Sequence, residues 1–165
     1  MLKTEFKADK AMEAIRRAAE RLEDMTPLFE EVQEYMVAQT RQRFIDGKSP
    51  QGVAWAAKTA NTLARYKARG YGNLTRPLIG PGKRLSREII GQATRSGAVI
   101  GSALIYSRVM QEGAEAGQFG STRTGRPLPF GRIPARPWLG ISPADETALV
   151  EMAEEYAGKP LAGDG

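Results

Sequence analysis

The sequence predicts an α+β protein, with long N-terminal helices and a C-terminal helix packed against a small antiparallel sheet. Apolar residues recur at three- and four-residue steps in several segments, which is typical of amphipathic helices. Two short apolar segments flank a turn that contains glycine, which predicts a β-hairpin. With 165 residues, of which 41% are hydrophobic, the chain can form one domain with its own core. We expect this domain over residues 1–157, followed by a flexible tail at 158–165.

The N-terminal part is expected to contain a short strand and two helices. Polar and apolar residues alternate at 2–6, as in a half-buried strand, and helical spacing follows over 10–24. A second and longer helix starts at Thr26, which a proline follows. Gly47 is expected to end this helix, and Pro50 prevents its continuation.

Two aromatic residues are expected to anchor the segment that follows the long helix. Phe44 lies near the end of that helix, and Trp55 lies in the loop at 47–58. Both residues are large and apolar, so we assign them mainly to the core.

The middle of the chain combines a basic helix, an irregular segment and the hairpin. Residues 59–69 have the spacing of a short helix, whereas the glycines and prolines of 70–84 predict irregular structure. We expect strands at 85–93 and 98–103, joined by the turn at 94–97.

The C-terminal part is expected to hold a helical turn, a long loop and a final helix. Residues 104–112 can form at least one helical turn, and 113–132 are rich in glycine and arginine, which predicts a long mobile loop. The final helix is expected at 142–157, with Ser142 as its N-cap and acidic residues in its first turn.

The segment between this loop and the final helix is expected to be extended. Pro134 and Pro137 fix their own φ angles and keep the residues before them out of the helical region. The segment places Arg136 beside Trp138 and Leu139. A stiff segment of this kind packs either into the core of its own chain or against a neighbouring subunit.

The composition argues against most catalytic and metal sites. The chain has no cysteine and no histidine, which removes thiolate chemistry, the commonest general base and the usual zinc ligands. We expect no enzymatic activity, no cofactor and no metal site. Residues 1–6 lack the apolar segment of a secretory signal, and no apolar run is long enough to span a membrane.

Charge is distributed unevenly along the chain. The net charge is +5, but residues 41–95 carry twelve basic residues and two acidic ones, a net charge of +10. Such a segment repels itself unless an anionic partner is near. It either faces nucleic acid, held by sequence-independent attraction to phosphates, or forms a solvated face that pairs with acidic helices or with another subunit. No base-reading motif accompanies it.

Several segments, taken in order, resemble the tailed-phage virion morphogenesis family of tail-completion or head–tail neck proteins. They cover the order and spacing of that family over about residues 20–157. The segments are Thr40–Phe44, Ser49–Trp55, 62–65, Gly97–Gly101, Tyr106, Gln111–Gly113, Pro134–Gly140 and the Ser-Pro-x-Asp-Glu that follows. The chain departs from the family at Gly80–Leu85, where Asp-Thr-Gly-x-Leu is frequent, and at Met110, where a histidine is frequent.

The resemblance implies a structural protein that forms a ring at the head–tail junction of the virion, after synthesis in the cytoplasm of the bacterial host. Six copies are the first expectation and twelve the second, with neck and tail proteins as neighbours and genomic DNA passing through non-specifically. Some basic residues are expected to face the DNA channel or the next ring, and three residues to lie near a subunit interface. The first group is Lys58, Arg65, Lys67, Arg69, Lys83, Arg84 and Arg87, and the second is Arg136, Trp138 and Leu139.

Two other classes of function remain open from the sequence. A basic nucleic-acid-binding accessory protein would use the basic segment directly and would need no ring. A phage cell-wall hydrolase would need a pair of catalytic carboxylates in a cleft.

Overall fold

The structure is a computed structural model, and it describes residues 22–118, 120, 123–125 and 131–158. The predicted strand at 2–6, most of the predicted helix at 10–24 and nearly all of the predicted tail at 158–165 lie outside the described residues. Leu22 and Glu23 are helical, as expected for the end of the 10–24 helix.

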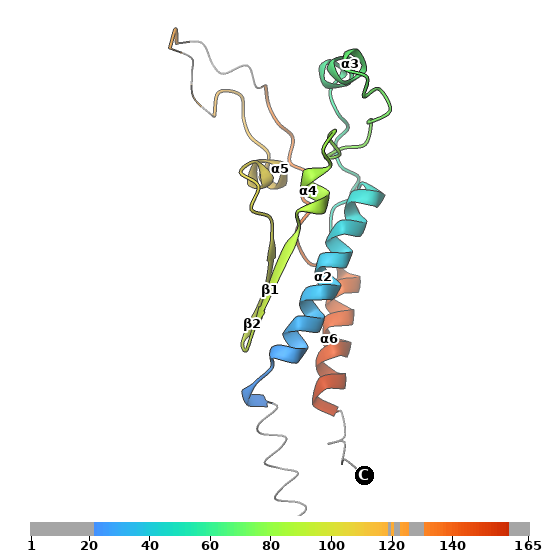
Figure 1. Cartoon of the computed structure of the whole chain (residues 1–165), viewed down its shortest axis with the longest axis vertical. Coiled ribbons are helices and arrows are strands. Elements are labelled where there is room, and N and C mark those ends of the chain that lie inside the picture. The colour runs from blue at the N-terminus through green and yellow to red at the C-terminus, as the bar shows by residue number, and fades with distance from the viewer. Residues whose placement is uncertain (1–21, 119, 121–122, 126–130, 159–165) are drawn as a thin grey trace, which may run out of the picture.

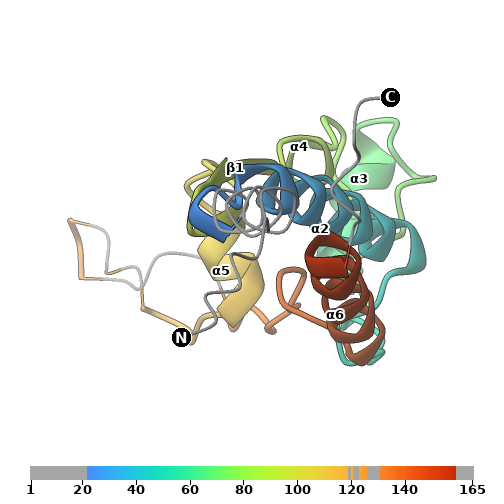
Figure 2. The ribbon, with the colours of Figure 1, turned by 90° about the horizontal axis from the view of Figure 1, so that it is seen from below.

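The long helix α2 (Thr26–Asp46) runs along the length of the molecule and organises the fold (Figure 1). The antiparallel hairpin of β1 (Ile90–Thr94) and β2 (Gly97–Gly101) packs on one side of it. Helix α6 (Pro143–Gly158) packs on another side, as the view from below shows (Figure 2). The protein is therefore an α+β protein with a small antiparallel sheet, as predicted.

Three short helices lie beyond the hairpin and α6, near the end of the molecule where α2 finishes (Figure 1). They are α3 (Ala60–Ala68), α4 (Arg84–Arg87) and α5 (Ser107–Glu112). Thr59 caps α3, because its side chain accepts a hydrogen bond from the backbone N–H of Thr62. The predicted helix at 59–69 is confirmed.

Helix α2 ends as its sequence predicts. Gly47 adopts the left-handed conformation, with φ at 70°, and its N–H donates to the carbonyl of Arg43 at 2.7 Å. Phe44 on the last turn and Trp55 in the following loop are 2% and 6% exposed, so their assignment to the core is confirmed.

The core forms where the end of α2 meets the start of the hairpin and the extended segment before α6. The Phe44 ring contacts Trp55 edge-on, with centroids 5.3 Å apart, and Trp138 in a tilted arrangement at 6.1 Å. The buried core residues are Phe44, Trp55, Leu85, Ile89, Leu104 and Trp138.

The hairpin begins later than the sequence predicts, and its turn is tighter. Residues 85–93 were expected as one strand, but 84–87 form the single turn α4, and β1 begins at Ile90. Leu85 of α4 and Ile89, just before β1, are both buried in the core. The second strand is 97–101 rather than 98–103.

A buried ion pair links the end of α2 to the start of α6. Arg43 donates to the carboxylate of Asp145 and also to the carbonyls of Trp138 and Gly140. Ser142 caps α6, because its hydroxyl accepts from the Asp145 N–H at 3.1 Å, while the Asp145 carboxylate accepts from the Ser142 N–H at 2.7 Å. The predicted N-cap is confirmed. Asp145 both pairs with Arg43 and accepts a hydrogen bond at the start of α6.

Candidate functional site

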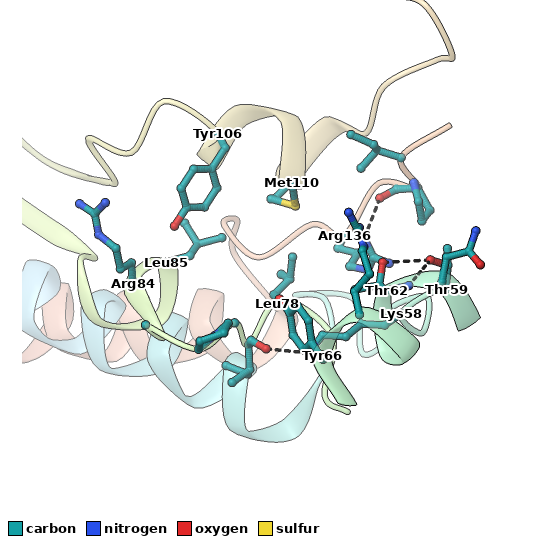
Figure 3. Close-up of a pocket in the computed structure, with 18 of the residues that line it drawn as sticks. Lys58, Thr59, Thr62, Tyr66, Leu78, Arg84, Leu85, Tyr106, Met110 and Arg136 are labelled. Atoms are coloured by element: carbon teal, nitrogen blue, oxygen red, sulfur yellow. Dashed lines mark hydrogen bonds between the residues drawn. The ribbon is translucent and has the colours of Figure 1, made fainter. Parts of the chain in front are cut away.

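A large groove is bordered by α3, α4 and α5 (Figure 3). Its volume is about 990 Å³, and Leu78, Leu85, Tyr106 and Met110 supply apolar parts of its lining. Every charged side chain that lines it in the described chain is basic. These are Lys58, Arg65, Lys83, Arg84, Arg132 and Arg136.

Two of these cations are held by backbone carbonyls rather than by acids. The Lys58 ammonium donates to the carbonyls of Leu74 and Ile79 and lies 4.6 Å from the centre of the Tyr66 ring. Burial, and then the neighbouring charge of Arg136, lower the pKa of Lys58 below its ordinary value. Burial also lowers the pKa of Arg136. The floor of the groove therefore has positive charge without a local counter-ion.

The other four cations lie closer to solvent. Arg84 pairs with Glu88 at 2.6 Å, and Arg132 pairs with Glu115 at 3.2 Å. In both pairs the basic and the acidic side chain are well exposed. Arg65 and Lys83 are exposed and make no ion pair with any described residue. Lys83 has a φ angle of 50°, a left-handed conformation that is uncommon for lysine.

The structure thus divides the seven predicted channel-facing residues into two groups. Four of them line the groove: Lys58, Arg65, Lys83 and Arg84. The other three, Lys67, Arg69 and Arg87, are exposed but do not line it. The ammonium of Lys58 is already engaged by carbonyls of its own chain, so its charge acts on a ligand mainly at a distance.

Arg132 and Arg136 complete the groove, although the sequence did not mark either residue for it. Arg132 stands at the end of the segment predicted as the 113–132 loop. The described ends of that segment meet in a bridge, where Ala114 and Ile133 exchange backbone hydrogen bonds of 2.8 and 2.9 Å. This bridge, which joins residues far apart in sequence, places Arg132 at the groove.

The predicted interface residues are held by their own chain. The Arg136 guanidinium donates to the carbonyls of Ala56 and Ala57 at 2.7 and 3.0 Å. Trp138 is 3% exposed, and Leu139 packs partly buried against the core. The burial of Trp138 is that of an internal anchor, and a role for the three residues near a subunit interface remains a prediction.

Gln111 of α5 fixes this segment, which sequence reasoning did not foresee. Its side-chain oxygen accepts from the N–H groups of Trp138 and Leu139 at 2.8 and 2.9 Å, and its amide donates to the Leu139 carbonyl at 2.8 Å. The partner of a glutamine 27 residues away could not be identified from a local pattern.

The described residues show neither a cluster of potential metal ligands nor a membrane-spanning helix. No group of three or more Asp or Glu side chains comes together in them as a metal site. No described helix is long and apolar enough to cross a bilayer.

A groove whose described charged residues are all basic, and whose lining is partly apolar, is typical of a surface that binds another molecule. The chain belongs to the phage virion morphogenesis family, whose family model matches residues 6–157. The resemblance noted from the sequence is confirmed, and the protein has a structural role in building the phage virion. Comparisons with curated proteins and with solved structures gave no match.

Proposed function

We propose that the protein is a structural component of the phage neck, which completes the upper end of the tail as an oligomeric ring around the DNA path. The proposal includes six copies as the first expectation, twelve as the second, and no enzymatic activity. Its neighbours are neck and tail proteins, and it meets genomic DNA without reading its sequence.

The observation that carries this proposal is family membership over residues 6–157 combined with a basic surface. Of the twelve basic residues at 41–95, only Arg43, Arg84 and Arg95 make ion pairs within the described chain. Unpaired cations attract phosphates of any sequence, which suits a passage through which a whole genome must move.

A basic accessory protein that binds nucleic acid without forming a ring is the second candidate, and the same unpaired cations favour it. The two candidates differ in their affinity for free DNA. An accessory protein should bind duplex DNA tightly, with an affinity that falls steeply as salt rises. A ring subunit should bind free DNA weakly as a single chain.

Deletion of the gene in the phage that encodes the chain tests the proposal. The neck function predicts that filled heads and separate tails accumulate and that the wild-type chain supplied in trans restores joined particles. Complementation with Lys67→Glu/Arg69→Glu/Arg87→Glu should restore joined particles that deliver DNA poorly. Fully infectious particles without the chain would contradict a neck function.

A further inference from the structure

We propose that the basic groove receives the acidic face of helix α6 from a second copy of this chain, in a head-to-tail contact between neighbouring subunits. The acidic face is defined by Val150, Glu151 and Glu154, in the second half of the helix. This contact rests on the proposed function, because it supplies the joint between the subunits of a ring.

The groove presents more positive charge than its own chain neutralises. Arg65 and Lys83 lack an acidic partner among the described residues, and the charges of Lys58 and Arg136 are met by carbonyl dipoles and, for Lys58, by the face of the Tyr66 ring. A carboxylate brought into this space would be attracted by several cations at once, and partial exclusion of water would strengthen the attraction.

Helix α6 presents the complementary surface. It contains no basic residue, and Glu151 and Glu154 are exposed and make no ion pair with the described chain. Positions 150 and 154 are four residues apart and positions 151 and 154 are three apart, which are the spacings that place side chains on one side of a helix. Val150 is 52% exposed, so an apolar side chain stands beside the two acids.

The apolar parts of the two surfaces also match. Tyr106, just before α5, Met110 of α5 and Leu78 opposite them point into the groove (Figure 3). A valine beside two glutamates can contact such a lining while the glutamates reach the cations. Nucleic acid presents a charged phosphate backbone along its whole length, whereas the lining between the cations is partly apolar, so we favour a protein helix as the occupant.

A single chain cannot make this contact within itself. Helix α6 runs antiparallel to α2, since its first turn meets Arg43 and its last turn meets Asp24 through the Tyr156 hydroxyl. Its acidic face therefore lies toward the start of α2, whereas α3, α4 and α5, which border the groove, lie near the end of α2 (Figure 1). Only another molecule can bring the two surfaces together.

A contact between two different surfaces of the same chain is heterologous, and repetition of it closes a ring when the rotation permits. In this arrangement the cations of the groove bind the acidic face of the neighbouring subunit. Lys67, Arg69 and Arg87, which lie outside the groove, are then the candidates for facing DNA.

Charge reversal on each surface, followed by mixing, tests the contact. Arg65→Glu/Lys83→Glu and Glu151→Lys/Glu154→Lys, made in the full chain, should each weaken self-association measured by analytical ultracentrifugation by at least about tenfold. An equimolar mixture of the two variants should restore association, because each variant then meets an opposite charge on the other. Lys67→Glu/Arg69→Glu, a matched reversal outside the groove, should associate like the wild type.

A cross-link places the two surfaces directly against each other. The chain has no cysteine, so Lys83→Cys and Glu151→Cys variants, once mixed, offer one thiol each to a short bis-maleimide. Dimers that form from the mixture far faster than from either variant alone support the contact. Equal rates, or a wild-type chain that stays monomeric up to roughly 1 mM, would overturn it.

The outcomes separate this contact from the proposed function. If the reversed groove loses DNA binding while self-association is unchanged, the groove serves nucleic acid and the contact is wrong. If association is unaffected but the labelled chain is still found at the neck, the ring uses another joint and the neck function stands.

Discussion

The buried ion pair between Arg43 and Asp145 gives the most quantitative prediction. Asp145→Asn keeps the size of the side chain and retains an oxygen that can accept from the Ser142 N–H, but it removes the negative charge. The Arg43 guanidinium then stays buried with only the carbonyls of Trp138 and Gly140 as partners. The two side chains are 9% and 3% exposed, so solvent cannot replace the lost charge.

Removal of one partner of a buried pair destabilises proteins by about 3–5 kcal/mol. Because two carbonyl partners of Arg43 remain, we expect about 3 kcal/mol at pH 7, near the lower end of that range. For a chain of this size, this loss lowers the melting temperature by about 6–12 °C. Glu146→Gln changes the next residue, which is exposed and makes no ion pair with the described residues, and should melt within about 2 °C of the wild type.

The same pair predicts how the difference between the two proteins depends on pH. Burial tends to raise the pKa of Asp145, but hydrogen bonds from Ser142, the charge of Arg43 and the Tyr35 hydroxyl outweigh it, and the pKa is lowered from 3.8. Stability from the ionised group is therefore complete above the unfolded pKa and is lost as the pH falls through the folded pKa.

Urea unfolding of wild type and Asp145→Asn between pH 7 and pH 2 measures this dependence. The difference in free energy of unfolding should be constant above about pH 5 and should shrink below about pH 4, since a protonated aspartic acid resembles asparagine. A variant as stable as the wild type at pH 7, or a difference that grows on acidification, would refute the reasoning.

Three further variants test the packing around the groove and the hairpin. Gly91→Val should lower the free energy of unfolding by about 1–3 kcal/mol in thermal unfolding, because a Cβ at Gly91 would lie 2.3 Å from the Gln33 Cγ. The control Gly97→Ala, whose Cβ would have nothing within 4 Å, should change it by less than about 0.5 kcal/mol. Equal effects would argue against close packing of β1 on α2. Gln111→Leu should lower the free energy of unfolding in urea by about 2 kcal/mol, because it leaves the part-buried N–H groups of Trp138 and Leu139 without their partner. Glu112→Gln on the same helix is the control and should leave this free energy nearly unchanged. Lys58→Met should accelerate amide hydrogen exchange at residues 71–80 by about tenfold without global unfolding. The substitution removes the donor to the carbonyls of Leu74 and Ile79 in that segment. Unchanged exchange would mean that the segment does not depend on the Lys58 ammonium.

Local patterns predicted the elements whose causes are local. The long helix followed from Thr26-Pro27 and the left-handed Gly47, and the last helix from its Ser142 cap. The predicted start of the hairpin was wrong because Leu85 and Ile89, four residues apart, lie on one face of the segment whether it is a strand or a helix. Both are buried in the core, and the backbone at 84–87 is helical.

The groove and the ion pair could not be predicted in the same way. Arg43 stands in the last turn of α2, but its carboxylate partner, Asp145, stands 102 residues later. Lys58, Arg65 and Lys83 were singled out by charge alone, and only the fold shows that they share a groove with Arg132 and Arg136. Spacing along the chain carries no information on such contacts until the elements are placed in space.

Electron cryo-microscopy of virions that carry a small tag on this chain tests the central claim most directly. The structural ring that we propose predicts tag density at the head–tail junction, repeated around the tail axis with a fixed copy number and with the axis left open for DNA. Virions without tag density at that junction, or with the tag elsewhere on the particle, would contradict it.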